Sequence, residues 1–481
     1  MTNLSGNLSP QQKVSVACDG PQGVGMDILR NALDKAIPEG YKQTDIGVIP
    51  EDWETLTLDK FIVSTQLGGN YKNSESESNY PLIKMGNLNR GKIKLDKLEY
   101  VIGNVIPRDQ LQYGDVLFNT RNTLELVGKV AIWRDELPEA YFNSNLMKFT
   151  FSDKFVSSNL YVNLAMNSDR FVTDLAGIAT GTTSVAAIYT KDLLKLKLSL
   201  PPKKEQTAIA NALSDMDALL SELEKLIAKK QAMKTATMQQ LLTGQTRLPQ
   251  FAYYSDINST EGAVEVKRKG TKPSELGEIP DDWEVTSVAS LCEIATGSTP
   301  PTNDVRNYGG EYLFISPADL KGQKYVDKSI KLLSKEGWSI CRKFPPNSIL
   351  FTCIDSTIGK CGLTRNWTTS NQQINAVFPS EKINFDYLYY QLAYAATRIK
   401  EQAGEQAVPI INKTEFGKSL IYRSQHAEEQ TAIATILSDM DNEIQTLEQR
   451  LSKTRQIKQG MMQELLTGKT RLPFDKIADK E

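Results

Sequence analysis

Two segments of the chain carry apolar residues at alternating steps of four and three positions. The apolar positions are Ile209, Leu213, Met216, Leu220, Leu223 and Ile227 in the first segment, and Ile433, Leu437, Met440, Ile444, Leu447 and Leu451 in the second. This spacing places one apolar stripe along a helix and is typical of a coiled-coil seam. Thr243-Gly244 and Thr467-Gly468 follow as helix stops. The pattern predicts two long helices of about 38 residues, or about 57 Å each.

The remaining chain alternates short apolar runs with turn residues, a pattern that favours strands over long helices. The clearest predicted strands lie at residues 80–83, 115–118, 146–151 and 349–352. Helices are also expected around residues 157–175 and 27–36, the latter with Ile28, Leu29, Ala32 and Leu33 on one face. Mixed elements of this kind predict an α/β fold.

The chain contains an internal repeat. Residues 205–249 and 429–473 align without a gap and agree at 25 of 45 positions, and residues 40–54 return as residues 270–284. Between these echoes, about 150 residues in each half show little likeness. Matching ends with divergent middles indicate one scaffold that holds two domains with different recognition surfaces. Trp53 and Trp283 lie in the echoed segments, and we expect them to anchor the core where each domain meets its helix.

The repeat also predicts how the helices pair. Each apolar stripe must be buried, and a duplicate stripe in the same register is the simplest partner. Pseudo-twofold symmetry then makes the pair antiparallel. The expected organisation, in chain order, is a leader with a short helix (1–39), an α/β unit (40–202), a long helix (203–246), a second α/β unit (247–425), a second long helix (426–470) and a tail (471–481).

Composition narrows the class of protein. The 481 residues carry a formal net charge of −2, whereas a protein that binds nucleic acid alone is more often basic. Five cysteines form no CxxC pair, and no apolar run approaches the roughly 20 residues that span a bilayer. These features favour a cytoplasmic protein with reduced thiols.

Catalytic signatures are missing from the sequence. The single histidine, His426, has no second histidine or cysteine near it, which excludes a sequence-evident zinc site or histidine triad. Residues 86–92 match GxxxxGK, but Ile93 stands where a magnesium-binding hydroxyl is needed. We therefore expect a non-enzymatic chain with no metal and no cofactor of its own.

The repeated motifs resemble the specificity (S) subunits of type I restriction–modification systems. The resemblance rests on the paired IP[ED]DWE segments, the EQTAIA…LSDMD helices and the [QE]LLTG.TRLP exits, and covers residues 40–473. It implies that residues 40–202 and 247–425 are target-recognition domains, each reading half of a bipartite, asymmetric DNA site. It further implies that the spacer helices set the spacing and dock two modification subunits, while restriction subunits complete a nuclease. S-adenosylmethionine, ATP and magnesium would be bound by those partners.

Candidate DNA contacts are the amides, bases and small polar residues in the divergent middles, because Arg and Lys read guanine and Asn and Gln read adenine. In the first domain they are Lys84, Asn87, Asn89, Arg90, Lys92, Asn119, Arg121, Asn122 and Lys129, and in the second Asp355, Ser356, Thr357, Lys360, Asn371, Gln372 and Gln373. Each could instead cap a turn or lie solvated.

Two alternatives remain open from the residues. A non-DNA adaptor that assembles proteins through its coiled coil explains the acidic balance directly, but not the divergent middles. A self-contained enzyme is disfavoured by the missing catalytic motifs.

Overall fold

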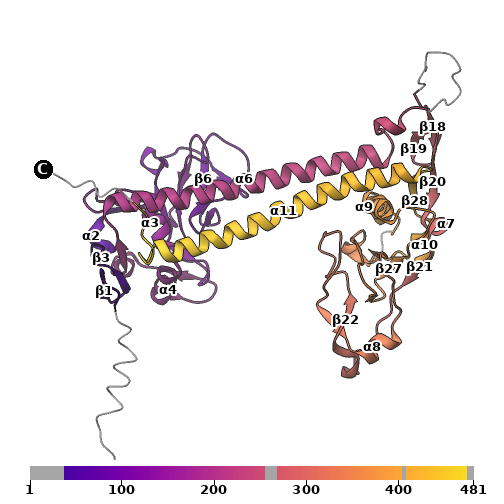
Figure 1. Cartoon of the computed structure of the whole chain (residues 1–481). Helices are drawn as coiled ribbons and strands as arrows, with labels where there is room; N and C mark the ends of the chain where they lie inside the picture. The colour runs from indigo at the N-terminus through magenta and orange to yellow at the C-terminus, as the bar shows by residue number, and fades with distance from the viewer. Residues whose placement is uncertain (1–36, 255–267, 404–407, 474–481) are drawn as a thin grey trace, which may run out of the picture. The chain divides into compact units, whose positions relative to one another are not determined.

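The computed structural model describes residues 37–254, 268–403 and 408–473 (Figure 1). The chain divides into two compact units: unit 1 is Met1–Ala218 with Thr454–Glu481, and unit 2 is Leu219–Lys453. Most of the expected leader (1–36), with its short helix, and residues 474–481 of the expected tail lie outside the described residues. Each unit therefore contains one domain, part of the first long helix and part of the second.

Both long helices are present, as the apolar spacing predicts. They are α6 (Lys203–Leu242) and α11 (Ala427–Leu465). Gly244 and Gly468 follow them with φ of +72° and +70°, the left-handed conformation that ends a helix and suits glycine. A Cβ at these positions would lie 2.5 Å from a Pro280 ring atom and 2.4 Å from a Pro50 ring atom. The two stops thus need glycine both for their backbone and for the proline packed against them.

The helices pair antiparallel, and each unit shows this with the same ion pair. In unit 1, Lys458 of α11 donates to Asp217 of α6 at 2.8 Å. In unit 2, Lys234 of α6 donates to Asp441 of α11 at 2.5 Å. Each residue of one pair is the repeat equivalent of a residue in the other, so the contacts carry the pseudo-twofold symmetry that the repeat predicts.

Burial along the apolar stripes changes from the ends to the middle. Ile209 and Leu213 belong to the core cluster of unit 1, and Ile433 and Leu437 belong to that of unit 2. The buried stripe residues nearer the middle are Leu220, Leu223, Ile227 and Ile444. Met216, Met440, Leu447 and Leu451 are half-buried. The start of each stripe thus forms part of a domain core, and helix pairing remains a prediction for the rest.

Unit 1 is built from small sheets and short helices. Its central antiparallel sheet has the order β12 (Val130–Ile132), β10 (Val116–Asn119), β14 (Leu146–Phe151), β4 (Ile62–Leu67). A second sheet has the order β13 (Tyr141–Phe142), β6 (Pro81–Ile83), β9 (Glu99–Val101), β5 (Asn73–Ser74), and a third has β11 (Arg121–Asn122), β16 (Ala186–Ala187), β15 (Thr180–Gly181). Two-stranded pairs are β1 (Tyr41–Thr44) with β2 (Gly47–Pro50), β3 (Glu54–Thr57) with β17 (Lys197–Leu200), and β7 (Leu88–Asn89) with β8 (Lys92–Ile93). The helices are α2 (Leu58–Phe61), α3 (Asn159–Met166), α4 (Asp169–Ile178) and α5 (Thr190–Leu193), with a 3₁₀ turn η1 (Pro107–Asp109).

Unit 2 repeats this plan with different outer strands. Its central sheet has the order β25 (Cys361–Leu363), β24 (Ile349–Thr352), β27 (Ile374–Val377), β21 (Ile294–Thr296), beside a sheet β23 (Lys331–Leu333), β22 (Tyr308–Ile315), β26 (Thr369–Ser370). The two-stranded pairs are β18 (Thr271–Ser274) with β19 (Gly277–Pro280) and β20 (Trp283–Ser287) with β28 (Leu420–Ser424). The helices are α7 (Val288–Leu291), α8 (Lys335–Ile340), α9 (Phe385–Glu401) and α10 (Lys413–Lys418), with 3₁₀ turns η2 (Pro249–Phe251), η3 (Val305–Asn307) and η4 (Asp355–Thr357).

The divergent middles share more structure than their sequences suggest. The two central sheets have equivalent strand orders, and the residue that ends the second strand in the order (β10 or β24) donates to an equivalent loop carbonyl in both: Asn119 N to Lys129 O, and Thr352 N to Lys360 O. Backbone groups make these bonds, so the side chains are free to differ. The likeness missing from the sequence is therefore present in the backbone.

One expected helix is wrong in detail. Residues 157–175 were expected to form one helix, but the structure has α3 and α4 with a break at Asn167 and Ser168. Ser168 caps α4 by accepting from the Phe171 amide, and such a cap starts a new helix instead of continuing the old one. In unit 2 the same region is the unbroken 17-residue helix α9.

Candidate nucleic-acid interface

Three segments of unit 1 meet at one edge of its central sheet. Thr120 N, just after β10, donates to Asn145 O at 3.0 Å, and Ile188 N donates to Thr120 O at 3.0 Å. β11 pairs with β16 in the β15–β16 hairpin. We call residues 119–124, 143–145 and 180–188 the loop edge of unit 1.

Unit 2 has an equivalent loop edge. Cys353 N donates to Gln373 O at 2.9 Å, and Ile411 N donates to Cys353 O at 2.9 Å. Ile354 forms an isolated antiparallel β-bridge with Ile410, which corresponds to the antiparallel pairing of β11 with β16 in unit 1. We call residues 353–357, 371–373 and 408–411 the loop edge of unit 2.

The same backbone frame presents different side chains in the two units. Arg121 and Asn145 occupy the places of Ile354 and Gln373. Arg121, Gln372 and Gln373 are exposed. Asp355 is also exposed, with a φ of +55°, which is unusual for a non-glycine residue and is a feature of functional loops. Two edges with one geometry and different exposed chemistry suit the reading of two different ligands.

Some of the predicted contacts in the loop edges have structural partners. Asn119 is fully buried; its amide donates to Leu126 O and its oxygen accepts from Arg121 N. Asn122 accepts from Thr123 N. Asn371 donates to Gln373 Oε1 at 2.9 Å. Thr357 donates to Ile354 O, and Ser356 donates to the Asp355 carboxylate at 3.5 Å. The Gln372 side-chain oxygen accepts from the Thr299 hydroxyl. Lys360 is exposed and Lys129 half-buried. Asn119 thus shapes the edge from beneath.

The first predicted cluster lies on the β7–β8 hairpin, outside the loop edge. Lys84 forms an ion pair with Glu99 at 2.9 Å. Asn87 is buried and accepts from Lys84 N while donating to Lys94 O. Lys92 lies 2.6 Å from Asp217 of α6. Asn89 and Arg90 are exposed. Three of these five predicted DNA contacts (Lys84, Asn87 and Lys92) therefore bond other parts of the protein. Lys92 connects the hairpin to α6.

Each domain joins its helix through a repeated set of buried polar contacts. In unit 1, Trp53 Nε1 donates to Glu205 at 3.0 Å, and Arg471 bonds both Glu205 and Asp52. Both tryptophans, Trp53 and Trp283, are fully buried, so they anchor the cores as expected from their echoed positions.

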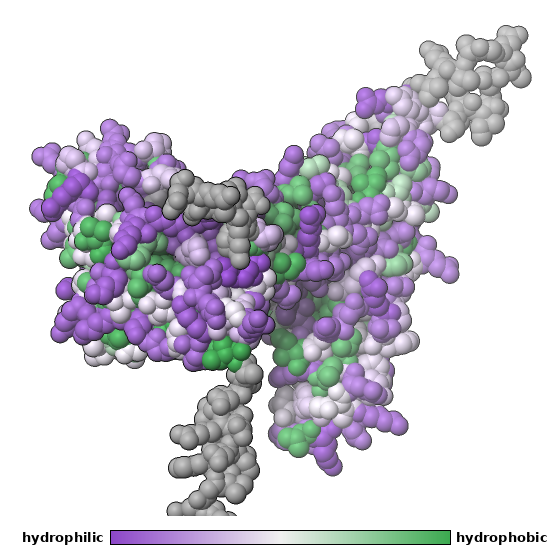
Figure 2. Space-filling model, turned by 60° about the vertical axis from the view of Figure 1, so that its left-hand side comes forward, coloured by the Kyte–Doolittle hydropathy of each residue, from purple (hydrophilic) through white to green (hydrophobic). Residues whose placement is uncertain are grey.

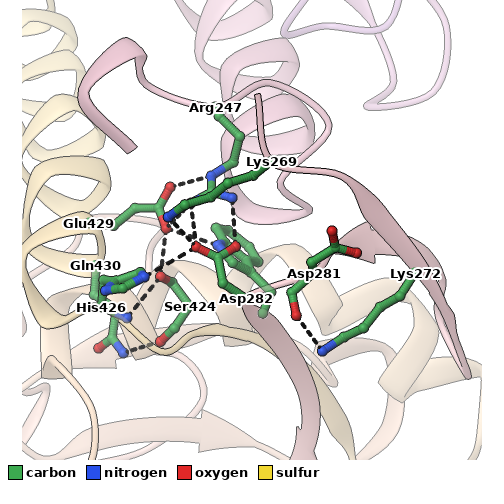
Figure 3. A network of polar contacts seen from close by, with 10 residues as sticks. Arg247, Lys269, Lys272, Asp281, Asp282, Ser424, His426, Glu429 and Gln430 are labelled. Atoms are coloured by element: carbon green, nitrogen blue, oxygen red, sulfur yellow. Dashed lines mark hydrogen bonds and ion pairs between the residues drawn. The ribbon is translucent and has the colours of Figure 1, made fainter. Parts of the chain in front are cut away.

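Figure 3 shows the same arrangement in unit 2. Arg247 donates to Glu429 at 2.6 and 3.0 Å and to Asp282 at 2.8 and 3.2 Å, and Trp283 Nε1 donates to Glu429 at 2.8 Å. The side chain of His426 is 45% exposed and lies 3.2 Å from Asp282. In each unit, one arginine bonds two carboxylates. These bonds join the start of one long helix, the segment that follows the other long helix, and the segment that carries the tryptophan.

The junction of unit 2 lowers the pKa of Asp282. Partial burial raises it, but hydrogen bonds from Arg247 and Lys269 and their positive charges outweigh burial and bring the pKa to about 2. The charged carboxylate is thus favoured in the folded state. The stability that this group contributes is fully present above the unfolded value near 3.8 and is lost as pH falls through about 2.

Acid should therefore weaken unit 2 through Asp282. We expect its stability to fall between about pH 4 and pH 2, and Asp282→Asn to be less stable at neutral pH with a flatter dependence on pH in this window. Hydrogen exchange of β20 peptides across an acid series measures this. Asp281→Asn, at the exposed neighbouring residue, should retain the wild-type slope; equal slopes for wild type and Asp282→Asn would contradict the assignment.

Several residues of the loop edges are not among the predicted DNA contacts. Asn143 and Asn145 precede β14 as Asn371 and Gln373 precede β27, and the shared signal is an Asn-x-amide-aliphatic pattern. The β15–β16 hairpin was also missed, although Gly181 at its turn is a signal. Val185 at its tip is 69% exposed, and Val408 and Ile410 of unit 2 are 49% and 56% exposed. Such apolar side chains can contact thymine methyl groups.

Within the described residues, no group of three or more His, Cys, Asp or Glu side chains could hold a metal ion. The helices in the same part of the chain include none that is long and apolar enough to cross a membrane. On the face shown in Figure 2, hydrophobic residues form small separate areas within a mostly hydrophilic surface.

Comparison with known proteins identifies the family. Residues 50–233 and 280–456 match the type I restriction modification DNA specificity domain. The putative type I restriction enzyme MjaX specificity subunit of Methanocaldococcus jannaschii is 27% identical over 447 residues, which cover 90% of this chain and 97% of that protein. The MjaVIII specificity subunit of the same organism is 25% identical and covers 90% of this chain and 96% of its own length.

The fold has a counterpart among solved structures. The S subunit of a type I restriction–modification system from M. genitalium aligns with a TM-score of 0.54 at 14% identity, covering 88% of this chain and 97% of that one. Its likeness supports the predicted fold class, and the family match supports a role in DNA recognition over both the adaptor and the enzyme alternatives. The chain belongs to the DNA specificity subunits of type I restriction–modification systems, which recognise a DNA sequence and are not themselves enzymes.

Proposed function

We propose that each loop edge reads one half of a bipartite, asymmetric DNA site. The observation that carries this proposal is the shared backbone frame with different side chains: exposed Arg121 takes the place of half-buried Ile354, and half-buried Asn145 takes the place of exposed Gln373. A common frame keeps the approach to the duplex the same, while the differing side chains select different bases.

The partners follow from the family. Two modification subunits would methylate adenines flipped from the duplex, with S-adenosylmethionine bound by those subunits. Restriction subunits would supply the ATP- and magnesium-dependent cleavage. The specificity subunit would act in the cytoplasm, where it meets DNA. The net charge of −2 is compatible with this scheme if partners supply part of the positive surface.

Long-read methylome sequencing with and without the gene tests the function directly. Expression beside the modification subunits should produce one asymmetric, bipartite methylated motif that disappears on deletion of the gene. Unchanged methylation in the deletion strain would reject the proposal, and co-purification of a protein complex without DNA binding would favour the adaptor.

Single substitutions in the two edges should alter different half-sites. We expect Gln373→Ala to cost about 1–3 kcal/mol of discrimination at one position of one half-site. Asn145→Ala, at the equivalent place in the other unit, should relax only the other half-site. Methylome sequencing of the two variants checks this, since each is the control for the other. A shared effect on both half-sites would contradict separate readers.

A surface on α6 supports docking of the modification subunits. Leu219, Leu226 and Met233 repeat every seven residues outside the buried stripe and are 37%, 39% and 46% exposed. This spacing places them along one helix face, which can accept a further amphipathic helix.

Charge on this face should weaken assembly. We expect Leu226→Glu with Met233→Glu to lower affinity for the modification subunits at least tenfold, because two carboxylates would have to be desolvated in the interface. Analytical ultracentrifugation of the mixed subunits measures the loss. Ala228→Glu with Thr235→Glu adds the same two charges to other exposed positions of α6, also seven residues apart, and should retain assembly. Equal losses would point to a general charge effect.

A further inference from the structure

Unit 1 contains a hollow of about 540 Å³ at its helix–domain junction. The β1–β2 hairpin, the break between α3 and α4, strand β17 and the end of α11 line it. Its lining includes Ile46, Val48, Ala165, Ser168, Ser199 and Leu466. Most of the bordering surface is apolar, and charged side chains, among them Asp169, Arg170 and Glu464, also border the space. The space is large enough for several side chains.

The repeat identifies the counterpart of this hollow in unit 2. Tyr161 and Tyr387 are equivalent, since each amide is capped by the residue before its helix and each hydroxyl donates to the last β-pair: to Ser199 O and to Tyr422 O. Counting along the helices from these tyrosines places Ala165 at Gln391, and the register of the last β-pair places Ser199 at Tyr422.

Large side chains fill the counterpart. Gln391 donates to Leu242 O at 2.8 Å, and the rings of Tyr394 and Tyr422 lie 6.5 Å apart. Tyr422 also donates to Leu276 O at 2.9 Å on the hairpin. Unit 1 has Ala165 and Ser199 in place of Gln391 and Tyr422. The hollow therefore lies where these two larger side chains are in unit 2.

We propose that the segment of residues 27–36 binds in this hollow through the apolar face that its sequence predicts. The segment lies outside the described residues, and its helical spacing places Ile28, Leu29, Ala32 and Leu33 on one face. Aliphatic side chains of this kind can cover the apolar part of its lining, and removing apolar surface from water is favourable.

The position of the segment in the chain favours it over other occupants. Residue 36 precedes β1 by only five positions, a distance of at most about 18 Å, and the β1–β2 hairpin forms one wall of the hollow. Such a short tether gives the segment a millimolar effective concentration. A partner that recognises the repeated features of both units would find this space in unit 1 alone. An occupant unique to the start of the chain accounts for that asymmetry.

Paired cysteines in the full chain test the docking. In a Cys18→Ser background, Leu33→Cys is combined with Gln463→Cys, an exposed residue that lines the hollow. We expect disulfide formation at least tenfold faster than for Asn31→Cys with Gln463→Cys, because residue 31 lies on the polar face of the same predicted helix. The matched pair differs only in which face carries the thiol.

A filled hollow provides the second test. Adding Ala165→Gln and Ser199→Tyr, which introduces the side chains found at the equivalent places of unit 2, should slow disulfide formation between Leu33→Cys and Gln463→Cys at least tenfold. Circular dichroism checks that the chain remains folded. Equal rates for positions 31 and 33, or a rate unaffected by filling, would overturn the proposal. So would protection of Gln463→Cys from a thiol reagent only on adding purified modification subunits, which would make a partner the occupant.

Discussion

Replacing Glu429 with alanine is expected to lower the free energy of unfolding of unit 2 by about 3–5 kcal/mol, the usual cost of removing one partner from a buried ion pair. Glu429 is fully buried and accepts hydrogen bonds from Arg247, Trp283 and Ser424. Its loss leaves the Trp283 Nε1 group without its acceptor and Arg247 with only Asp282 as the carboxylate partner. Native-state hydrogen exchange of β20 and the first turns of α11 measures the change.

The neighbouring residue supplies the control. Glu428 precedes Glu429 on the same helix but is exposed, so Glu428→Ala should change stability by less than about 0.5 kcal/mol. Glu205→Ala should reproduce the large effect in unit 1, where Trp53 and Arg471 bond the same carboxylate. If Glu428 and Glu429 proved equally sensitive, the effect would reflect helix charge and not the junction.

Lengthening both helices by one heptad should lengthen the unspecified gap of the DNA site by about three base pairs. Seven residues extend a helix by about 10 Å, close to the rise of three base pairs. Insertion between Asp217 and Lys230 of α6, and between Glu443 and Lys458 of α11, keeps the ion pairs of Asp217 with Lys458, Lys230 with Glu443, and Lys234 with Asp441 in register. We expect methylation to move entirely to the longer site, with both half-sites unchanged.

A single-helix insertion is the matched control. Seven extra residues in α6 alone shift one ion pair relative to the other by about 10 Å, so only one can form. That variant should lose methylation of the original and the lengthened site alike. Methylome sequencing distinguishes the outcomes, and a changed half-site with an unchanged gap would refute the spacing role of the helices.

The scaffold was predictable because its signals are local or repeated. The stripe from Ile209 to Ile227 predicts α6, and Gly244 marks its end through a backbone conformation that few residues adopt. Trp53 was identified as a core residue because it recurs as Trp283. In these places, side-chain type and spacing determine the structure.

The candidate site was less predictable because its frame is made by backbone groups. The bonds that place Thr120 and Cys353 use amides and carbonyls that nearly every residue carries, so they leave no pattern in the sequence. Lys92 shows the second difficulty. It reads as a basic loop residue, but its partner Asp217 lies 125 positions away and becomes visible only in the fold. Which loop-edge residues contact bases stays a prediction.

The junction of unit 1 also determines when this protein can finish folding. Arg471 follows both long helices in the chain and bonds Glu205 and Asp52, so the first domain lacks part of its junction until residue 471 has been synthesised. Unit 2 obtains the equivalent contacts from Arg247, which is synthesised before Glu429. A premature stop shortly before residue 471 would thus damage the domain made first, while every residue of the domain made last had already been translated.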